Sequence, residues 1–274
     1  MSDTTPIPRL SPSIAKILIE KSPMHAYNDH SLLGGNRADK SSEAKDEGLI
    51  YESIIFGFGL DNDRFKIIQA DDYRTNSAKQ LRDEARENNQ IPILEKNVQE
   101  YLDFGKLLLE KINQQGIYFD GGEFQKHVEW ESSSANCHGF IDYWAAKTAT
   151  VIDLKIVSDA SPKKFVRSFV DFGYDIQMAA YIEGIETTMP ELAGRVNHLF
   201  IACEKEPPHC VQLYNMSGMM MSLGQSKWQW AKDKWAECLS TNHWPGYFEG
   251  IGRLEPLPWQ INYESIIETN PMED

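Results

Sequence analysis

The sequence predicts an α/β fold in one domain, with a central mixed sheet flanked by helices. Two runs show the two-residue alternation of strands, at 140–144 and 150–157, and a run of good helix formers follows at 174–181. With 274 residues and 41% hydrophobic content, the chain can bury one sizeable core. We expect a helical amino-terminal part at about 10–115 and a core that carries the chemistry at about 116–265.

The two predicted strands carry charged residues where a buried sheet should be apolar. Alternation places Asp153 and Lys155 on one face of the second strand. The other face, which we expect to form the core, carries Ile152, Leu154 and Ile156. An antiparallel pairing of the two strands brings Asp142 roughly opposite Asp153. Two carboxylates and one ammonium group should therefore converge on one patch.

This combination of groups favours metal-dependent hydrolysis of a phosphodiester. Two close carboxylates repel each other unless a cation lies between them, and oxygen ligands suit Mg²⁺, with Mn²⁺ as its substitute. Such an ion polarises a phosphate and lowers the pKa of bound water, while a lysine can orient the nucleophile. The alternative is a surface hairpin in which Asp142, Asp153 and Lys155 form ordinary solvated pairs, and this short pattern alone leaves both readings open.

The predicted helix at 174–181 adds a polar side chain near this patch. Tyr174, Gln177 and Tyr181 are three and seven residues apart, so they share one face of the helix. A glutamine can both donate and accept hydrogen bonds, which suits the binding of a phosphate or of a nucleophilic water. The alternative is that the tyrosines simply pack on the sheet, with Gln177 at the edge of the contact.

The order of these motifs resembles a known superfamily. G-F-I-D at 139–142, V-I-D-L-K at 151–155 and Y-D-I-Q-M-A-A-Y at 174–181 are similar to the PD-(D/E)XK nucleases, and among them to the RecE-type exonucleases (exonuclease VIII) of phages and prophages. Similar flanking segments are Leu10–Ser13 with Lys21–Pro23, Tyr73–Lys79, Trp244–Tyr247 and Leu257–Trp259. The resemblance therefore extends over nearly the whole chain. It rests on the order and spacing of these segments and not on any single one of them.

The resemblance implies an activity and a set of partners. Such an enzyme would degrade linear double-stranded DNA from the 5′ end and leave a 3′ single-stranded tail for recombination. It would work with a single-strand annealing protein and as a closed ring, a trimer or tetramer. The implied Mg²⁺ ligands are Glu52, Asp142, Asp153 and the Leu154 carbonyl. Lys155 would orient the attacking water, and Gln177 would act in catalysis by positioning the scissile region together with Tyr181. Tyr181 and Tyr174 would contact the DNA.

Two glutamates need separate treatment. Glu52 stands where RecE-type enzymes have a histidine, and nucleases of the lambda exonuclease type carry a glutamate in this helix. Its neighbours at 49–50 and 54–56 are apolar, so an unpaired carboxylate would be costly there and a metal would satisfy it. The alternatives are that Glu52 faces solvent or pairs with a lysine. Glu129 matches a glutamate that often precedes the first aspartate, although a glutamate on a solvated edge strand is the commoner case.

The net charge of −14 opposes binding to DNA unless the cations are concentrated locally. Lys163, Lys164 and Arg167 follow the metal motif, and we expect this group to contact DNA. Arg74 begins a second basic group along a predicted helix. For that group, contact with DNA and pairing with acidic residues of the same helix are equally good explanations.

Other features bound the class of protein. The first residues have no basic and apolar leader pattern, and no apolar stretch is long enough to span a bilayer, so we expect a cytoplasmic protein. The four cysteines form no C-x-x-C pair, which argues for reduced thiols and against zinc ribbons or an iron–sulfur cluster. Trp228 and Trp235 share one face of a late helix, which we interpret as core or as a contact between subunits of the ring.

Two rival functions remain open at this point. A structure- or sequence-specific endonuclease would use the same metal chemistry and differ only in access to the site. A catalytically silent DNA-binding or scaffold protein belongs to another class. The intact set of Asp142, Asp153 and Lys155 speaks against it, because a silent protein has no need for a costly charged cluster.

Overall fold

The structure is a computed structural model that describes residues 6–35 and 43–257. At its centre is a five-stranded mixed sheet in which each strand neighbours the next along the chain. Only β5 and β6 run parallel, and the other neighbours are antiparallel. The strands are β3 (Glu123–Glu131), β4 (Asn136–Ala145), β5 (Thr150–Val157), β6 (Asn197–Glu204) and β7 (Val211–Tyr214). The predicted mixed sheet flanked by helices is confirmed.

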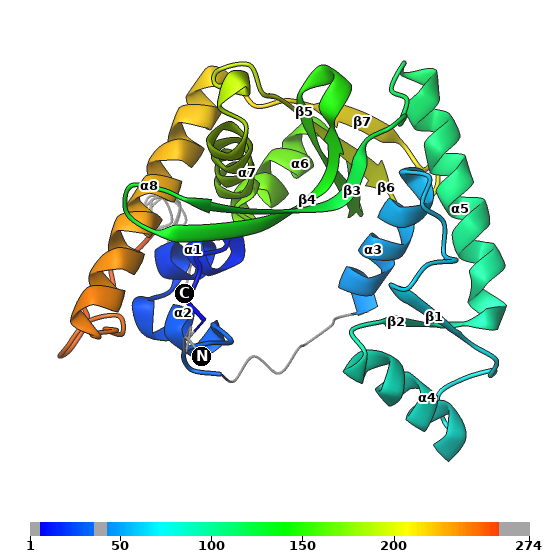
Figure 1. Ribbon diagram of the computed structural model, residues 1–274, viewed down its shortest axis with the longest axis horizontal. Helices are drawn as coiled ribbons and strands as arrows, with labels where there is room; N and C mark the ends of the chain where they lie inside the picture. Colours follow the sequence, from blue (N-terminus) through cyan, green and yellow to red (C-terminus); the bar gives the residue numbers. More distant parts are fainter. Residues whose placement is uncertain (1–5, 36–42, 258–274) are drawn as a thin grey trace, which may run out of the picture.

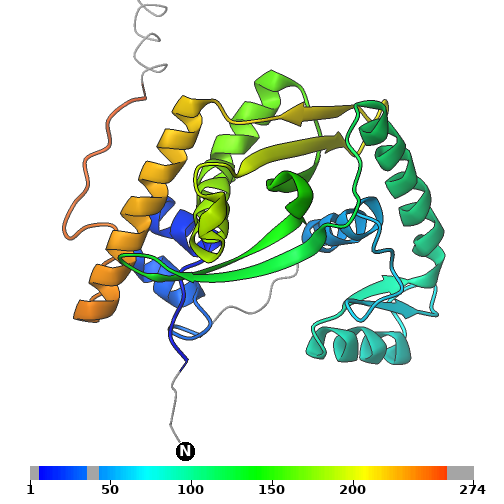
Figure 2. The ribbon, with the colours of Figure 1, turned by 45° about the horizontal axis from the view of Figure 1, so that its top comes forward.

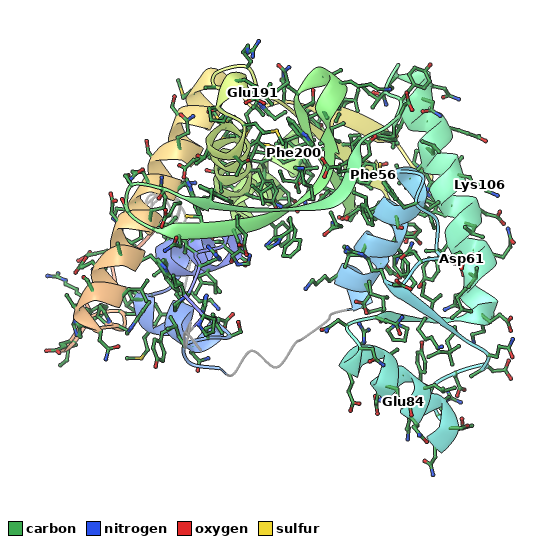
Figure 3. All side chains as sticks on the ribbon, viewed as in Figure 1. Phe56, Asp61, Glu84, Lys106, Glu191 and Phe200 are labelled. Carbon is green, nitrogen blue, oxygen red and sulfur yellow. The ribbon has the colours of Figure 1, made fainter. Side chains whose placement is uncertain are left out.

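Five helices cover one face of this sheet (Figure 1). They are α1 (Pro12–Glu20), α2 (Pro23–Asp29), α6 (Pro162–Asp171), α7 (Tyr174–Thr188) and α8 (Gly218–Thr241). The larger hydrophobic cluster fills this layer, and Phe200, labelled in Figure 3, is fully buried in it. Because α1 and α2 pack beside α7 and α8, the first helices of the chain join the same layer as the last one.

A second group of helices lies on the opposite face of the sheet (Figures 1 and 2). It contains α3 (Glu43–Ile55), α4 (Asn76–Glu87) and α5 (Glu95–Gln114), together with a two-stranded parallel sheet of β1 (Phe65–Ile68) and β2 (Ile91–Leu94). The apolar face of β5 packs here, since Ile152 and Leu154 share a cluster with Tyr51 and Ile55 of α3.

Both faces of the sheet are therefore buried, which the alternation in β5 did not predict. Val151 lies on the same face as Asp153 and is fully buried under the α7 layer. Only the apolar face was expected to form the core. The charged face is covered as well because the β5–β6 pair is parallel, and parallel strands are normally covered by helices on both sides.

The strands β1 and β2 were also missing from the predicted helical amino-terminal part. Each has only four residues, and Pro92 interrupts the second one. Runs this short give no reliable alternation, so a sequence pattern cannot distinguish them from loops. They join α4 and α5 to α3 through the small cluster of Ile50, Ile54, Leu60, Phe65, Ile91 and Ile93.

Two local predictions for the helices can be compared with the structure. The side chain of Ser11 caps α1 by accepting a hydrogen bond from Ile14 N–H, with Pro12 in the first turn. Trp228 and Trp235 of α8 are 1% and 0% exposed, so they belong to the core and cannot supply a surface between subunits. Trp230 is the tryptophan of this helix that faces outward.

The cysteines, the possibility of a membrane span and the carboxy-terminal segment were also addressed by the sequence. The four cysteines are free, and all but Cys210 are buried. Across the described parts of the chain, no helix combines the length and apolar character needed to cross a membrane. Of the carboxy-terminal segment matched by resemblance, Leu257 is described and exposed, while Pro258 and Trp259 lie outside the described residues.

Candidate active site

The candidate site lies where β4 and β5 separate. Their antiparallel pairing ends at Tyr143 and Ile152, so the next residues, Asp142 and Asp153, face each other across the opening. Asp142 Oδ2 accepts a hydrogen bond of 3.2 Å from the backbone N–H of Leu154. The side chain of Asp142 thus bonds to the β5 backbone at the end of the ladder, and the predicted proximity of the two aspartates is confirmed.

The regular pairing of β3 and β4 is interrupted at Gln125 and Asp142. Ile141 belongs to the cluster beside α7, whereas Tyr143 belongs to the cluster beside α3, so the alternation of β4 changes phase between them. Opposite Asp142, Gln125 of β3 has a φ of 48° and is absent from the register of paired residues. A left-handed backbone is unusual for glutamine in a strand, and such strain is typical of functional sites.

Lys155 lies between the two aspartates. Its Nζ is 2.5 Å from Asp153 Oδ1 and 3.7 Å from Asp142 Oδ2. Asp153 is completely buried, yet within the described residues neither of its side-chain oxygens has a partner with hydrogen-bond geometry. The ion pair with Lys155 already occupies Oδ1, whereas Oδ2 has neither a hydrogen bond nor an ion pair among the described residues. A buried carboxylate oxygen normally receives a hydrogen bond, so Oδ2 marks a position with unused binding capacity.

Glu52 adds a third carboxylate from the other side of the sheet. It lies on α3, is 8% exposed, and accepts a hydrogen bond of 2.8 Å from Gln125 Nε2. It therefore neither faces solvent nor forms an ion pair with a lysine among the described residues. Sequence reasoning missed Gln125, because nothing in the pattern E-F-Q-K indicates a left-handed residue.

The electrostatics show that negative charge is in excess. Burial and the charge of Asp153 raise the pKa of Asp142 to about 7. Burial likewise raises the pKa of Asp153, and burial together with the charge of Asp142 raises the pKa of Glu52 well above its usual range. Burial lowers the pKa of Lys155, but the charges of Asp153 and Asp142 outweigh it and raise this pKa. One ammonium group thus serves three carboxylates.

Helix α7 borders the site with the three residues that share a predicted face. Gln177 Nε2 donates a hydrogen bond of 3.0 Å to Tyr181 Oη, and Lys155 Nζ lies 4.9 Å from the centre of the Tyr174 ring. Tyr181 is buried, and its ring lies so close to Gly139 of β4 that a Cβ there would come within 2.8 Å of it. The rings of Tyr174 and Tyr181 therefore pack against the sheet, which is the alternative that the sequence left open for them.

A groove of about 730 Å³ reaches this border from outside. Gln177 and Tyr181 form part of its wall, the amino-terminal end of α1 forms another part, and Lys45 of α3 closes the far side. Phe140 of β4 and Phe172 before α7 also line the groove, and both are about half exposed. The groove is therefore accessible and partly basic and aromatic.

The other predicted residues lie outside this cluster. Lys163, Lys164 and Arg167 are exposed on α6, in the layer that also contains α7. Arg74 is almost fully exposed before α4, with its Nε 3.5 Å from Oδ2 of Asp72, a residue that also precedes the helix. Glu129 is exposed on β3 and forms an ion pair of 3.1 Å with Arg9, which fits a solvated edge strand.

The donor set fits a hard divalent cation. It offers three carboxylates, one orphaned buried aspartate and the backbone at Leu154, and oxygen ligands of this kind suit Mg²⁺ or Mn²⁺. Among the described residues, no three acidic, histidine or cysteine side chains converge on a preformed metal cage. Asp142 and Asp153 are therefore the first ligands to consider, with Glu52 as an addition from α3.

Fold and site together define the class of PD-(D/E)XK proteins. The chain belongs to the family described as "PDDEXK-like domain of unknown function (DUF3799)", which matches residues 18–254. That match includes all four charged residues of the cluster. A search of curated proteins found no match.

Two solved structures are similar to this chain. One, from Eubacterium rectale, is provisionally named an exonuclease; it is 14% identical, with a TM-score of 0.54 over 97% of this chain and 94% of that one. The other is a phage-related exonuclease from Haemophilus somnus, 11% identical, with a TM-score of 0.38 over 86% of this chain and 97% of that one. The first of these supports the fold.

Proposed function

We propose that this protein is a metal-dependent exodeoxyribonuclease that degrades linear double-stranded DNA. The observation that carries the proposal is the excess of buried carboxylates around Lys155, with Asp153 Oδ2 lacking any polar partner in the described chain. A cluster of this kind costs stability unless a cation compensates it. Family membership supports a nuclease, because the cluster lies on a PD-(D/E)XK fold.

The residues have distinct roles in this proposal. Asp142 and Asp153 would hold Mg²⁺ or Mn²⁺, with Glu52 and the Leu154 carbonyl as further ligands. When bound, such an ion supplies a polarised phosphate and a water of lowered pKa. Lys155 would orient the attacking water and stabilise negative charge that develops on the phosphate. Gln177, whose side chain is hydrogen-bonded to Tyr181, would hold a neighbouring phosphate.

The finer parts of the proposal concern the product and the partners. By resemblance to RecE-type enzymes, cleavage would run from 5′ to 3′ and leave 3′ single-stranded tails for recombination. A single-strand annealing protein would bind these tails, and the acidic surface offers a docking face for a basic partner. A cytoplasmic location is consistent with four free cysteines.

The ring assembly belongs to the same proposal. Net charge −14 gives a single chain poor non-specific affinity for DNA. Several copies of the exposed cations of α6 around one channel would concentrate positive potential there. Since Trp228 and Trp235 are buried in the core, the subunit contacts would have to come from other surfaces. A mass by light scattering of three or four times 31.3 kDa would support a closed trimer or tetramer.

One digestion tests the central claim and the direction of cleavage. Linear duplexes labelled at either the 5′ or the 3′ end are incubated with Mg²⁺, beside a covalently closed circle of the same sequence. We expect early release of the 5′ label as mononucleotide, late release of the 3′ label, and an intact circle. Cleavage of the circle would indicate an endonuclease, and no hydrolysis with either Mg²⁺ or Mn²⁺ would indicate a silent DNA-binding protein.

A further inference from the structure

Arg64 carries a guanidinium group that the folded chain leaves without an anionic partner. The residue lies just before β1 and is partly buried, and its Cζ is 5.1 Å from the centre of the Phe124 ring. Within the described ranges, its guanidinium has neither a carboxylate within ion-pair distance nor a hydrogen-bond acceptor. Its recorded contact is with the ring of Phe124.

The other arginines of the described chain behave differently. Most contact a carboxylate or a backbone carbonyl, namely Arg9, Arg74, Arg82, Arg86, Arg195 and Arg253. Arg167 is exposed to water on α6. In a chain with 41 acidic and 27 basic residues, a partly buried arginine without a carboxylate needs an explanation.

The position of Arg64 connects it to the site. Its platform, Phe124, directly precedes Gln125, whose side chain holds Glu52. Glu52 is also the ionisable group whose charge acts on Arg64, although the two form no ion pair. Arg64 is therefore close enough for the charge of Glu52 to act on it. The N–H groups of its guanidinium remain available to another anion.

The surrounding surface gives that anion a path. Arg64 lines a hollow of about 700 Å³ whose other charged residues are Lys45, Arg86, Asp46 and Asp63, with Arg86 and Asp46 paired to each other. Lys45 also lines the groove beside Gln177 and Tyr181. A polyanionic strand that follows the groove past the site would therefore reach Arg64 on the α3 side.

We propose that Arg64 binds a backbone phosphate of the DNA strand held at the site. This inference rests on the proposed function. A guanidinium held over an aromatic ring, as that of Arg64 is over Phe124, does not use its N–H donors on a carboxylate and can offer them to an anion. The fork of these donors matches two phosphate oxygens at once, which the single ammonium of Lys155 cannot do. Phe124 thus preorganises Arg64, as Gln125 preorganises Glu52.

The test compares Arg64→Ala and Arg64→Lys with a matched control, Arg195→Ala. Arg195 is exposed and bonds to the carbonyl of Glu191, so it reports the loss of one positive charge elsewhere on the surface. Binding of a fluorescein-labelled linear duplex is measured by anisotropy with Ca²⁺ in place of Mg²⁺, at several salt concentrations. Hydrolysis by the same proteins is measured with Mg²⁺, and thermal unfolding checks the fold.

We expect Arg64→Ala to lower kcat/KM by about 10- to 100-fold, the loss typical of a charged hydrogen-bonded contact. The slope of log affinity against log salt should fall by about 0.9, the amount for one phosphate contact. Arg64→Lys should restore most of the slope but only part of kcat/KM, because it keeps the charge and loses the fork. Arg195→Ala should leave both quantities unchanged. A purely structural role for Arg64 would not change the salt slope.

The outcomes separate this inference from the proposed function. If the wild-type protein hydrolyses DNA and Arg64→Ala leaves the slope and kcat/KM unchanged, Arg64 binds no phosphate. If the wild-type protein cuts no DNA but Arg64→Ala lowers the slope, the phosphate contact stands and the hydrolytic function is wrong. Should the alanine variant fail to fold, Arg64→Lys decides. Wild-type kcat/KM in that variant would then contradict the bidentate contact.

Discussion

Two clusters of buried charge in this protein differ in how their charges are balanced. In the cluster between α7 and α8, Lys232 Nζ donates a hydrogen bond of 2.6 Å to Glu183 Oε2, and Trp130 Nε1 donates one of 2.9 Å to Glu183 Oε1. One cation there meets one carboxylate, and both carboxylate oxygens have donors. In the cluster at the β4–β5 opening, three carboxylates share Lys155, and Asp153 Oδ2 has no polar partner among the described residues.

This difference separates a charge pair that stabilises the fold from a charge cluster that is suited to bind a cation. A balanced and fully bonded pair fastens α8 to α7 and β3, and its removal should affect folding alone. An unbalanced cluster reduces the stability of the protein without a ligand, and it is retained where a cation or a reaction uses it. The burial of Asp153 and Lys232 is similar, so burial alone would not separate the two clusters.

The largest expected effect is on hydrolysis. Asp153→Asn keeps the shape of the side chain and removes its charge, so we expect kcat/KM to fall by about 10³-fold, at the upper end of the range for one electrostatic group of an active site. Thermal unfolding without metal should occur at the same or a higher temperature, because repulsion within the cluster decreases.

The matched control for this variant is Glu183→Gln in the balanced cluster. It should keep wild-type kcat/KM and unfold at a lower temperature. If the two variants changed the same quantity in the same direction, the distinction between the clusters would be wrong.

The second effect is on stability. Lys232→Met leaves Glu183 without its counter-charge, and loss of one partner of a buried pair costs about 3–5 kcal/mol. The Glu183 side chain is 29% exposed, so we expect a smaller loss, about 2–3 kcal/mol, in the free energy of unfolding. Urea denaturation measures this value, and kcat should remain at the wild-type level. Wild-type stability in this variant would show that the pair contributes no net stability.

The third effect is on the pH dependence of stability. The pKa of Asp142 is raised to about 7 in the folded protein, against about 4 in an unfolded chain. The folded state therefore keeps a proton that the unfolded state releases, and the metal-free protein should lose stability as the pH rises from about 4 through about 7.

Unfolding temperatures at successive pH values, compared between the wild-type protein and Asp142→Asn, isolate this contribution. The difference between the two proteins should favour the variant increasingly above about pH 5. Saturating Mn²⁺ should remove the loss in the wild type, because ion binding favours the ionised carboxylate. A constant difference across this range would show that Asp142 titrates normally.

Part of this site was predictable because it is local in the sequence. Asp142, Asp153 and Lys155 lie within fourteen positions on two adjacent strands, so alternation and one antiparallel pairing bring them together. The helical face of Tyr174, Gln177 and Tyr181 follows from the spacing alone. The cap at Ser11 was accessible for the same reason.

The other half of the site depends on contacts that no local pattern encodes. Glu52 was identified only by resemblance, and the left-handed Gln125 that holds it has no signal in the sequence. Arg64 lies in a polar loop that looks like an ordinary solvated segment. Tertiary packing of α3 against the sheet brings Glu52 to Gln125, at the point where the alternation of β4 changes phase.

The most direct test of the account is a calorimetric titration of the metal-free protein with Mn²⁺. The account predicts saturable binding to the wild type and to Lys232→Met with similar dissociation constants, and at least tenfold weaker binding to Asp153→Asn, since that variant lacks the orphaned carboxylate. Absence of binding to the wild type, or equal binding to wild type and Asp153→Asn, would contradict the claim that the unbalanced cluster is a metal site.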